Sequence, residues 1–175
     1  MSRGSPTRRR LSTAGTRWLD PHFGNNCLDA HILDRIGDLE DPEVQQVIAL
    51  WESGELQIVL PHSVKSEIEH PNTPRDVKRR VADFIFTIPV TLTTAENDLH
   101  QRVLQIVQGN AKPNKHKKDS FHLVEAAKYA RYFITRDRRL LQKRDEIAGL
   151  LPQLRIATPA EFLAAYHNHR TQSSL

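Results

Sequence analysis

The sequence lacks the features that mark several large classes of protein. Its single cysteine, Cys27, has no partner for an internal disulfide, so we expect a reducing, cytoplasmic environment. No stretch approaches the ~20 consecutive apolar residues of a membrane span, and we expect no membrane association. The basic start of the chain leads into no apolar segment, which argues against a secretory signal. A glycine-rich phosphate loop is also missing, which disfavours P-loop and dinucleotide-binding enzymes.

The chain does contain enough apolar residues for one domain. It has 175 residues, of which 38% are hydrophobic, and a domain of this size buries roughly 70% of its unfolded surface. We expect a disordered basic arm over residues 1–22, a folded domain over 23–168 and a tail over 169–175. A net charge of +4, a pI of 9.4 and clustered Lys and Arg favour an anionic partner, most commonly nucleic acid.

Short apolar segments alternate with amphipathic ones along the chain. Strands are expected at residues 26–28, 56–60, 88–92, 132–135 and 154–157. Helical patterns lie between them, including 73–85 and 119–130, and a last helix ends at Tyr166. Thr158 and Glu161 form a capping box before that last helix. The alternation predicts an α/β fold, a three-layer sandwich with a central, mainly parallel sheet flanked by helices.

Four acidic side chains lie near the ends of predicted strands. Asp29 directly follows one strand, and Asp137 lies at the exit of a later one. Asp119 begins the helix that leads to this later strand, and Glu67 lies in another helix. Because sites in parallel sheets form at the carboxyl ends of strands, we expect all four to share one edge. Taken singly, the aspartates are also good helix N-caps, and Glu67 is also typical of a solvated helix residue, with Glu69 as a competitor. The joint position of the four is what favours a site.

A cluster of carboxylates points to a metal ion. Neighbouring carboxylates repel and raise one another's pKa, and a hard divalent cation such as Mg²⁺ or Mn²⁺ removes that problem. Such an ion makes hydroxide available near neutral pH and neutralises charge that develops on a phosphodiester. We therefore predict a Mg²⁺ or Mn²⁺ site for phosphodiester hydrolysis. The predicted metal ligands, which are also the predicted catalytic acids, are Asp29, Glu67, Asp119 and Asp137.

A basic loop, residues 109–118, leads directly into Asp119. Its lysines would hold a polyanion beside the acids, although charge runs of this kind are often only solvated. His122 lies on the same helical face as Asp119, where it either contacts RNA or hydrogen-bonds at the surface. The side chains expected to contact RNA are Lys112, Lys115, Lys117, Lys118, His122 and Arg136. One acidic run is interpreted as a solvated face: Asp34, Asp38, Glu40 and Asp41.

Four segments of the sequence resemble the acidic motifs of the PIN domain family. They are LDAHIL around Asp29, LPHSVKSE ending at Glu67, KKDSFHLVEAA around Asp119 and FITRDRRLL around Asp137. The resemblance covers roughly residues 26–166, and the order, spacing and strand context of the segments agree with the family throughout. No single segment is specific for the family, but the set of four in this order is more specific than any one of them.

The resemblance implies a metal-dependent endoribonuclease that acts on single-stranded RNA, often as the toxin of a toxin–antitoxin pair. It implies RNA as the substrate and an antitoxin protein as a partner, and we also expect a homodimer. The hydroxyl of Thr135 is implied to assist the site. The chain departs from the family at Ala30 and His31, where Ser or Thr followed by Asn is usual. This departure keeps open an alternative, a catalytically inactive domain of the same fold that serves as an RNA-binding or protein-assembly module.

Overall fold

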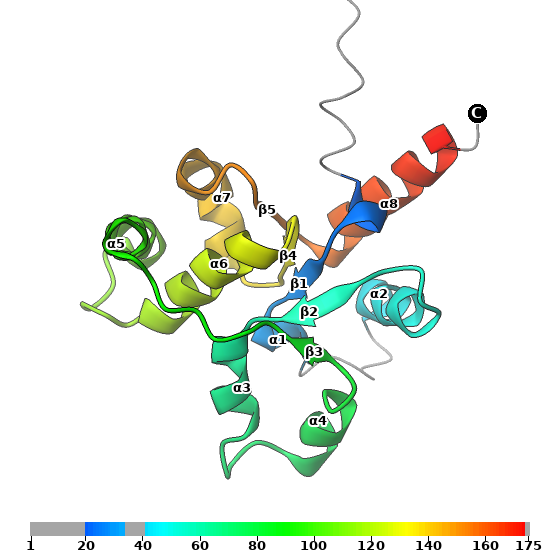
Figure 1. The fold of residues 1–175 in the computed structure, drawn as a ribbon, viewed down its shortest axis with the longest axis horizontal. Coiled ribbons are helices and arrows are strands. Elements are labelled where there is room, and N and C mark those ends of the chain that lie inside the picture. The colour runs from blue at the N-terminus through cyan, green and yellow to red at the C-terminus, as the bar shows by residue number, and fades with distance from the viewer. Residues whose placement is uncertain (1–19, 34–40, 174–175) are drawn as a thin grey trace, which may run out of the picture.

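Five parallel strands form the centre of the molecule, in the order β3-β2-β1-β4-β5 (Figure 1). The computed structural model describes residues 20–33 and 41–173 of the chain. The strands are β1 (Asn26–Leu28), β2 (Ile58–Leu60), β3 (Ile85–Phe86), β4 (Tyr132–Ile134) and β5 (Arg155–Ala157). Helices cover both faces, so the predicted α/β sandwich is confirmed, with every strand pair of the described residues parallel.

Helices connect the strands, and several of them begin at a side-chain cap. The helices are η3 (Pro21–Phe23), α1 (Ala30–Leu33), α2 (Pro42–Glu52), α3 (His62–Ile68), α4 (Arg75–Arg80), α5 (Thr94–Gln108), α6 (Lys117–Tyr129), α7 (Arg138–Leu150) and α8 (Pro159–Ser173). Asp41 caps α2, and the predicted capping box of Thr158 and Glu161 is present at the start of α8. Among the described residues, no helix has the length and apolar character that crossing a membrane requires.

The side chains of the central strands alternate between two apolar cores. Leu28 of β1, with Tyr132 and Ile134 of β4, faces the core that α2 and α8 cover. Cys27 and Phe133 face the opposite core, beneath α5, α6 and α7. Figure 1 shows these two groups of helices on opposite sides of the sheet. Because successive strand residues point to opposite faces, both strands are buried along their whole length, and burial raises the pKa of the Cys27 thiol.

The third strand lies earlier in the chain than the sequence predicts. The predicted strand over 88–92 is wrong, because β3 precedes it, and the helix expected over 73–85 is the shorter α4. Pro89 has no N–H to contribute to a ladder. The N–H of Thr87 instead continues the pairing by donating to the carbonyl of Leu60 at 2.8 Å. The chain then leaves the sheet at this outer edge.

Both ends of the domain extend beyond their predicted boundaries. Asp20 is buried and caps η3, where its carboxylate accepts a hydrogen bond from the N–H of His22 at 3.0 Å. The His22 ring stacks on Tyr166 of α8 with centroids 4.3 Å apart. Helix α8 continues to Ser173. The last residues of the predicted arm thus belong to the domain, and most of the predicted tail is helical. The rest of the predicted arm, residues 1–19, lies outside the described residues.

Candidate functional site

Two of the predicted acids, Asp29 and Asp137, lie at the carboxyl ends of the neighbouring strands β1 and β4. Asp29 follows β1 directly, and its N–H donates to the carbonyl of Ile134 at 3.0 Å. Its Oδ2 accepts a hydrogen bond from the hydroxyl of Thr135 at 2.5 Å. The oxygen of that hydroxyl accepts from the N–H of Asp137 at 2.9 Å. Thr135 is fully buried, so it ties the carboxylate of Asp29 to the backbone that carries Asp137.

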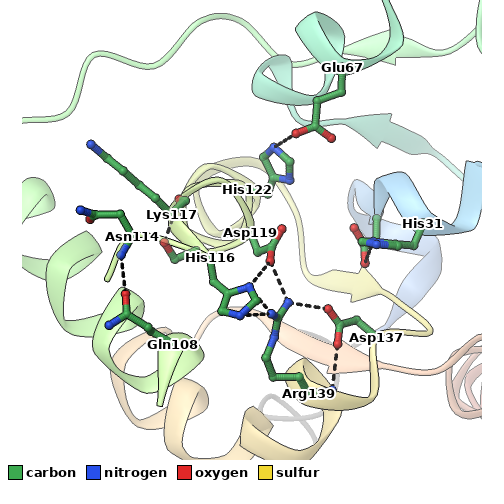
Figure 2. Close-up of polar contacts among 12 residues, drawn as sticks. His31, Glu67, Gln108, Asn114, His116, Lys117, Asp119, His122, Asp137 and Arg139 are labelled. Carbon is green, nitrogen blue, oxygen red and sulfur yellow. Dashed lines mark hydrogen bonds and ion pairs between the residues drawn. The ribbon is translucent and has the colours of Figure 1, made fainter. Parts of the chain in front are cut away.

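Asp119 and Asp137 converge on one guanidinium group, that of Arg139 in α7. The Nη2 atom of Arg139 lies 2.7 Å from Oδ2 of Asp119 and 2.7 Å from Oδ2 of Asp137. Asp137 is the N-cap of α7, and its Oδ1 accepts from the N–H of Arg139 at 2.8 Å. Asp119 is not a cap, because α6 begins after His116 and Asp119 lies within its first turn. Figure 2 shows Arg139 between the two carboxylates.

His31 lies beside three of the acids. Its Nδ1 is 3.6 Å from Oδ2 of Asp29, which is the distance of an ion pair rather than of a hydrogen bond. The Asp29 carboxylate raises the pKa of His31 to about 9, partial burial opposes this, and Asp137 and Asp119 add smaller increases. The imidazole is therefore protonated at neutral pH. At a position where the resemblance leads us to expect Asn, this chain places a cation among the acids.

Glu67 approaches the site from α3. Its Oε1 lies 3.4 Å from Nζ of Lys118 and 4.0 Å from Nε2 of His122. In Figure 2, His122 lies between Glu67 and Asp119. Glu67 and His31 also line the same hollow, which has a volume of about 200 Å³. Glu67 therefore lies at the border of the site, next to His122 and His31. The three aspartates, in contrast, are linked to one another through Thr135 and Arg139.

The donor set of the site suits a hard divalent cation. All four predicted ligands are carboxylates, and Mg²⁺ and Mn²⁺ prefer oxygen donors and retain several waters. Within residues 20–33 and 41–173, however, no group of three or more His, Cys, Asp or Glu side chains is arranged to hold a metal ion directly. The guanidinium of Arg139 lies where Asp119 and Asp137 would share such an ion. The donor chemistry thus fits Mg²⁺ or Mn²⁺, but in this structure the guanidinium of Arg139 holds Asp119 and Asp137 together.

The predicted RNA-contacting residues differ in how accessible they are. All four lysines of the basic loop are exposed: Lys112, Lys115, Lys117 and Lys118. His122, in contrast, is 4% exposed and faces Glu67, which leaves it little surface for contact with RNA. We infer that Lys112, Lys115 and Lys117 remain available to a polyanion, whereas Lys118 is paired with Glu67 and His122 lies behind that acid.

Arg136 is held by acidic residues of α2. Its Nη2 lies 2.5 Å from Oδ1 of Asp41 and 2.7 Å from Oε2 of Glu43. Asp41 is 4% exposed and caps α2, so its interpretation as part of a solvated face is wrong. The other members of that acidic run lie outside the described residues: Asp34, Asp38 and Glu40. Contact between Arg136 and RNA would therefore require these ion pairs to break.

Two side chains of the site were not found by sequence reasoning. Arg139 is one of several arginines after β4, and only the direction in which α7 leaves Asp137 turns this one toward the acids. His116 contacts the guanidinium of Arg139, with Nε2 2.6 Å from Nη1, and its Nδ1 lies 3.2 Å from Oδ2 of Asp119. His116 lies three residues before Asp119 at the start of a helix. This spacing is the one sequence signal that could have indicated the contact between His116 and Asp119.

Glu125 of α6 is a fifth acid that sequence reasoning did not single out. It is 1% exposed. Its oxygens accept hydrogen bonds from the N–H of His62 at 2.7 Å and from the hydroxyl of Thr87 at 2.8 Å. They also accept from the N–H of Ser63 at 3.1 Å and from its hydroxyl at 2.5 Å. Because these donors lie at the start of α3 and just after β3, Glu125 fixes α6 against the helix that carries Glu67.

No protein-family model, curated protein or solved structure matches the chain. The functional assignment therefore rests on the side chains at the carboxyl edge of the sheet, together with the resemblance of four short segments to the PIN domain family. Among these side chains, the convergence of Asp119 and Asp137 on one cation is the most informative feature.

Proposed function

We propose that the protein is a divalent-metal-dependent endoribonuclease that hydrolyses phosphodiester bonds of single-stranded RNA. The observation that carries this proposal is that Asp119 and Asp137, which come from different elements, lie 2.7 Å from the same positively charged nitrogen. Two carboxylates that converge on one cation can converge on a metal ion that takes its place. Asp29 lies at the same edge of the sheet, and Glu67 borders it. Mg²⁺ or Mn²⁺ would be held by these four acids.

The chemistry divides between the ion and the chain. When bound, Mg²⁺ or Mn²⁺ supplies a water of lowered pKa and neutralises charge that develops on the phosphodiester. The hydroxyl of Thr135 donates a hydrogen bond to Asp29, which orients that carboxylate. Asp137 is oriented by its role as the N-cap of α7. The protonated ring of His31 offsets part of the negative charge of the acids and suits a phosphate oxygen.

The substrate class follows from charge and from shape. The exposed lysines of the basic loop precede Asp119 along the chain and offer positive charge that does not depend on base sequence. A single strand can follow such a stripe of charge while one of its phosphates reaches the acids. The resemblance to the PIN domain family favours RNA over DNA. An antitoxin partner, a homodimer and a cytoplasmic location remain predictions from the sequence.

The proposal is tested by a metal titration followed by a cleavage assay. Calorimetry with Mn²⁺ on the full chain should show binding, and a labelled single-stranded RNA should be cleaved in Mn²⁺ or Mg²⁺ but not in EDTA. Cleavage that is unaffected by EDTA would exclude the metal-dependent mechanism. Tight Mn²⁺ binding without cleavage of any single-stranded substrate would exclude the nuclease.

One observation favours a second function, that of a catalytically inactive RNA-binding or protein-assembly module. Arg139 and His31 already place two positive charges among the acids, so the fold has less need of a metal ion. A module of this kind would bind RNA with the same affinity in EDTA and in Mn²⁺. Measuring RNA affinity in EDTA and in Mn²⁺, together with the cleavage assay, therefore separates the two functions.

A further inference from the structure

We propose that Arg139 is an internal competitor for the metal: it holds Asp119 and Asp137 together in the metal-free protein, and a divalent ion binds only by displacing it. This inference rests on the proposed function, because it concerns the same acids. Arg139, which is not one of the four predicted metal ligands, would then control how readily the ion binds.

The first argument is the geometry of the guanidinium. One nitrogen, Nη2, lies 2.7 Å from an oxygen of Asp119 and 2.7 Å from an oxygen of Asp137. These are charge-assisted hydrogen bonds of ordinary length, which are about twice as strong as neutral ones. A Mg²⁺ ion needs its oxygen ligands at about 2.0–2.1 Å, closer than the nitrogen now holds them. The nitrogen and the ion therefore cannot occupy the space between the two carboxylates together.

The second argument is the support that the guanidinium receives. Both ring nitrogens of His116 contact Nη1 of Arg139, and one of them, Nδ1, also lies 3.2 Å from Oδ2 of Asp119 (Figure 2). His116 thus connects Arg139 to α6 from the side opposite Asp137. Because these contacts come from the starts of two helices, α6 and α7, the arrangement is specific rather than the random contact of a long surface side chain.

The third argument is that the arrangement is incompletely satisfied. The Nε atom of Arg139 is buried and has no hydrogen-bond partner among the described residues. A buried donor without a partner carries a free-energy penalty, and moving the side chain into water would remove it. The side chain is already 29% exposed and lies in the first turn of α7, so a change of rotamer can take it to solvent. The contacts of Arg139 are therefore strong enough to compete with a metal ion for the two carboxylates, and the side chain can still move away from them.

Competition of this kind has a defined consequence for loading. The apparent dissociation constant of the ion equals its intrinsic value divided by the fraction of molecules in which Arg139 has left the acids. It also explains how the chain can gather three aspartates without a metal ion, since an uncompensated group of carboxylates would destabilise the fold. The absence of a directly metal-binding group among the described residues is the expected property of the arginine-occupied state.

The test compares Arg139→Met with Arg138→Met in the full chain. Both changes remove one positive charge from the first turn of α7 and keep an unbranched side chain, but Arg138 is exposed and has no part in the contacts described above. The Mn²⁺ dissociation constant is measured by calorimetry without RNA, and the thermal midpoint is measured in EDTA. Arg139→Met should bind Mn²⁺ about tenfold more tightly than Arg138→Met, which corresponds to about 1.4 kcal/mol. Its midpoint in EDTA should be lower than that of the control.

Each outcome bears on the two proposals differently. Equal Mn²⁺ affinities in the two variants, or weaker binding by Arg139→Met, would overturn the competition while leaving the nuclease intact if wild type still cleaves RNA. Binding by Arg139→Met alone would support the competition and show that the wild-type site is closed. If no variant binds Mn²⁺, both proposals fail. Should Arg139→Met not fold, Arg139→Gln gives the same comparison, with Arg138→Gln as its control.

Discussion

Helix α6 carries two acidic side chains that the protein uses in opposite ways. Asp119, in the first turn, has 28% of its side chain exposed, and its partners are a guanidinium and an imidazole. Glu125, further along the helix, is 1% exposed and accepts hydrogen bonds from two backbone N–H groups and two hydroxyls. One carboxylate is thus paired with basic side chains, and the other with uncharged hydrogen-bond donors.

The difference shows what makes an acid available for chemistry. Cations can be exchanged for one another, so a carboxylate that is held by Arg139 and His116 can also accept Mg²⁺. Backbone N–H groups at a helix start cannot leave without unfolding that helix, so Glu125 has no second state. Burial therefore marks Glu125 as the anchor of α3, whereas the partly exposed, cation-bound Asp119 belongs to the site.

The largest expected effect is that of Asp119→Asn on cleavage. The carboxamide keeps the shape of the side chain but loses the charge that attracts the ion, so RNA cleavage should fall by about two orders of magnitude or more. The thermal midpoint should change little, because the partly exposed ion pair with Arg139 is worth at most about 1 kcal/mol. Asp98→Asn, an exposed change of the same charge on α5, is the control. Retention of cleavage by Asp119→Asn in Mg²⁺ would contradict the mechanism.

The second effect is that of Glu125→Ala on stability. The change leaves several buried donors without an acceptor, each of which costs about 1–3 kcal/mol, so the free energy of unfolding should fall by at least about 3 kcal/mol. Urea denaturation measures it, with Glu69→Ala as the control, since Glu69 is an exposed acid beside α3. A loss below about 1 kcal/mol would show that Glu125 does not anchor α3.

A third, smaller effect concerns the lysines that precede Asp119. Lys112, Lys115 and Lys117 are the best set to replace with Gln, because Lys118 is ion-paired with Glu67 and its loss would disturb a predicted ligand. RNA affinity should weaken alike for all sequences, and each lost phosphate contact should reduce the slope of log K against log salt by about 0.7. Filter binding over a range of salt concentrations measures the slope. An unchanged slope would mean that this loop is only solvated.

The smallest expected effect is a pH dependence at the first turn of α6. Nε2 of His100 lies 2.9 Å from the hydroxyl of Ser120, and burial lowers the pKa of His100 below its usual value. As the pH falls below about 6.5, the unfolded chain takes up a proton that the folded protein does not, so folding stability declines. His100→Gln, which keeps a donor to Ser120, should flatten this decline. Urea midpoints between pH 7.5 and about 5 test it, and parallel curves for the two proteins would contradict it.

The sequence predicted the positions of the acids better than their partners. Asp29 and Asp137 follow β1 and β4, because a strand end and a helix start are local features that alternation and capping residues reveal. β3 was placed too late, because a strand of two residues at a sheet edge has almost no periodic pattern. Arg139 was missed for a different reason. Its contacts depend on how α7 packs against α6, and no local pattern distinguishes it from Arg138.

Because Cys27 is buried, the rate at which its thiol is labelled can be used to measure local opening of the fold. Cys27 is the one cysteine of the chain, it lies in the middle strand of the sheet, and none of its surface is exposed. A thiol reagent can react with it only after α5, α6 and α7 separate from this face of the sheet, so the labelling rate measures how often that core opens. If Mn²⁺ binds at the exit of β1, labelling should become slower in proportion to the occupancy of the site. Mass spectrometry of a single alkylated residue would then follow loading of the site without RNA and without any change to the sequence.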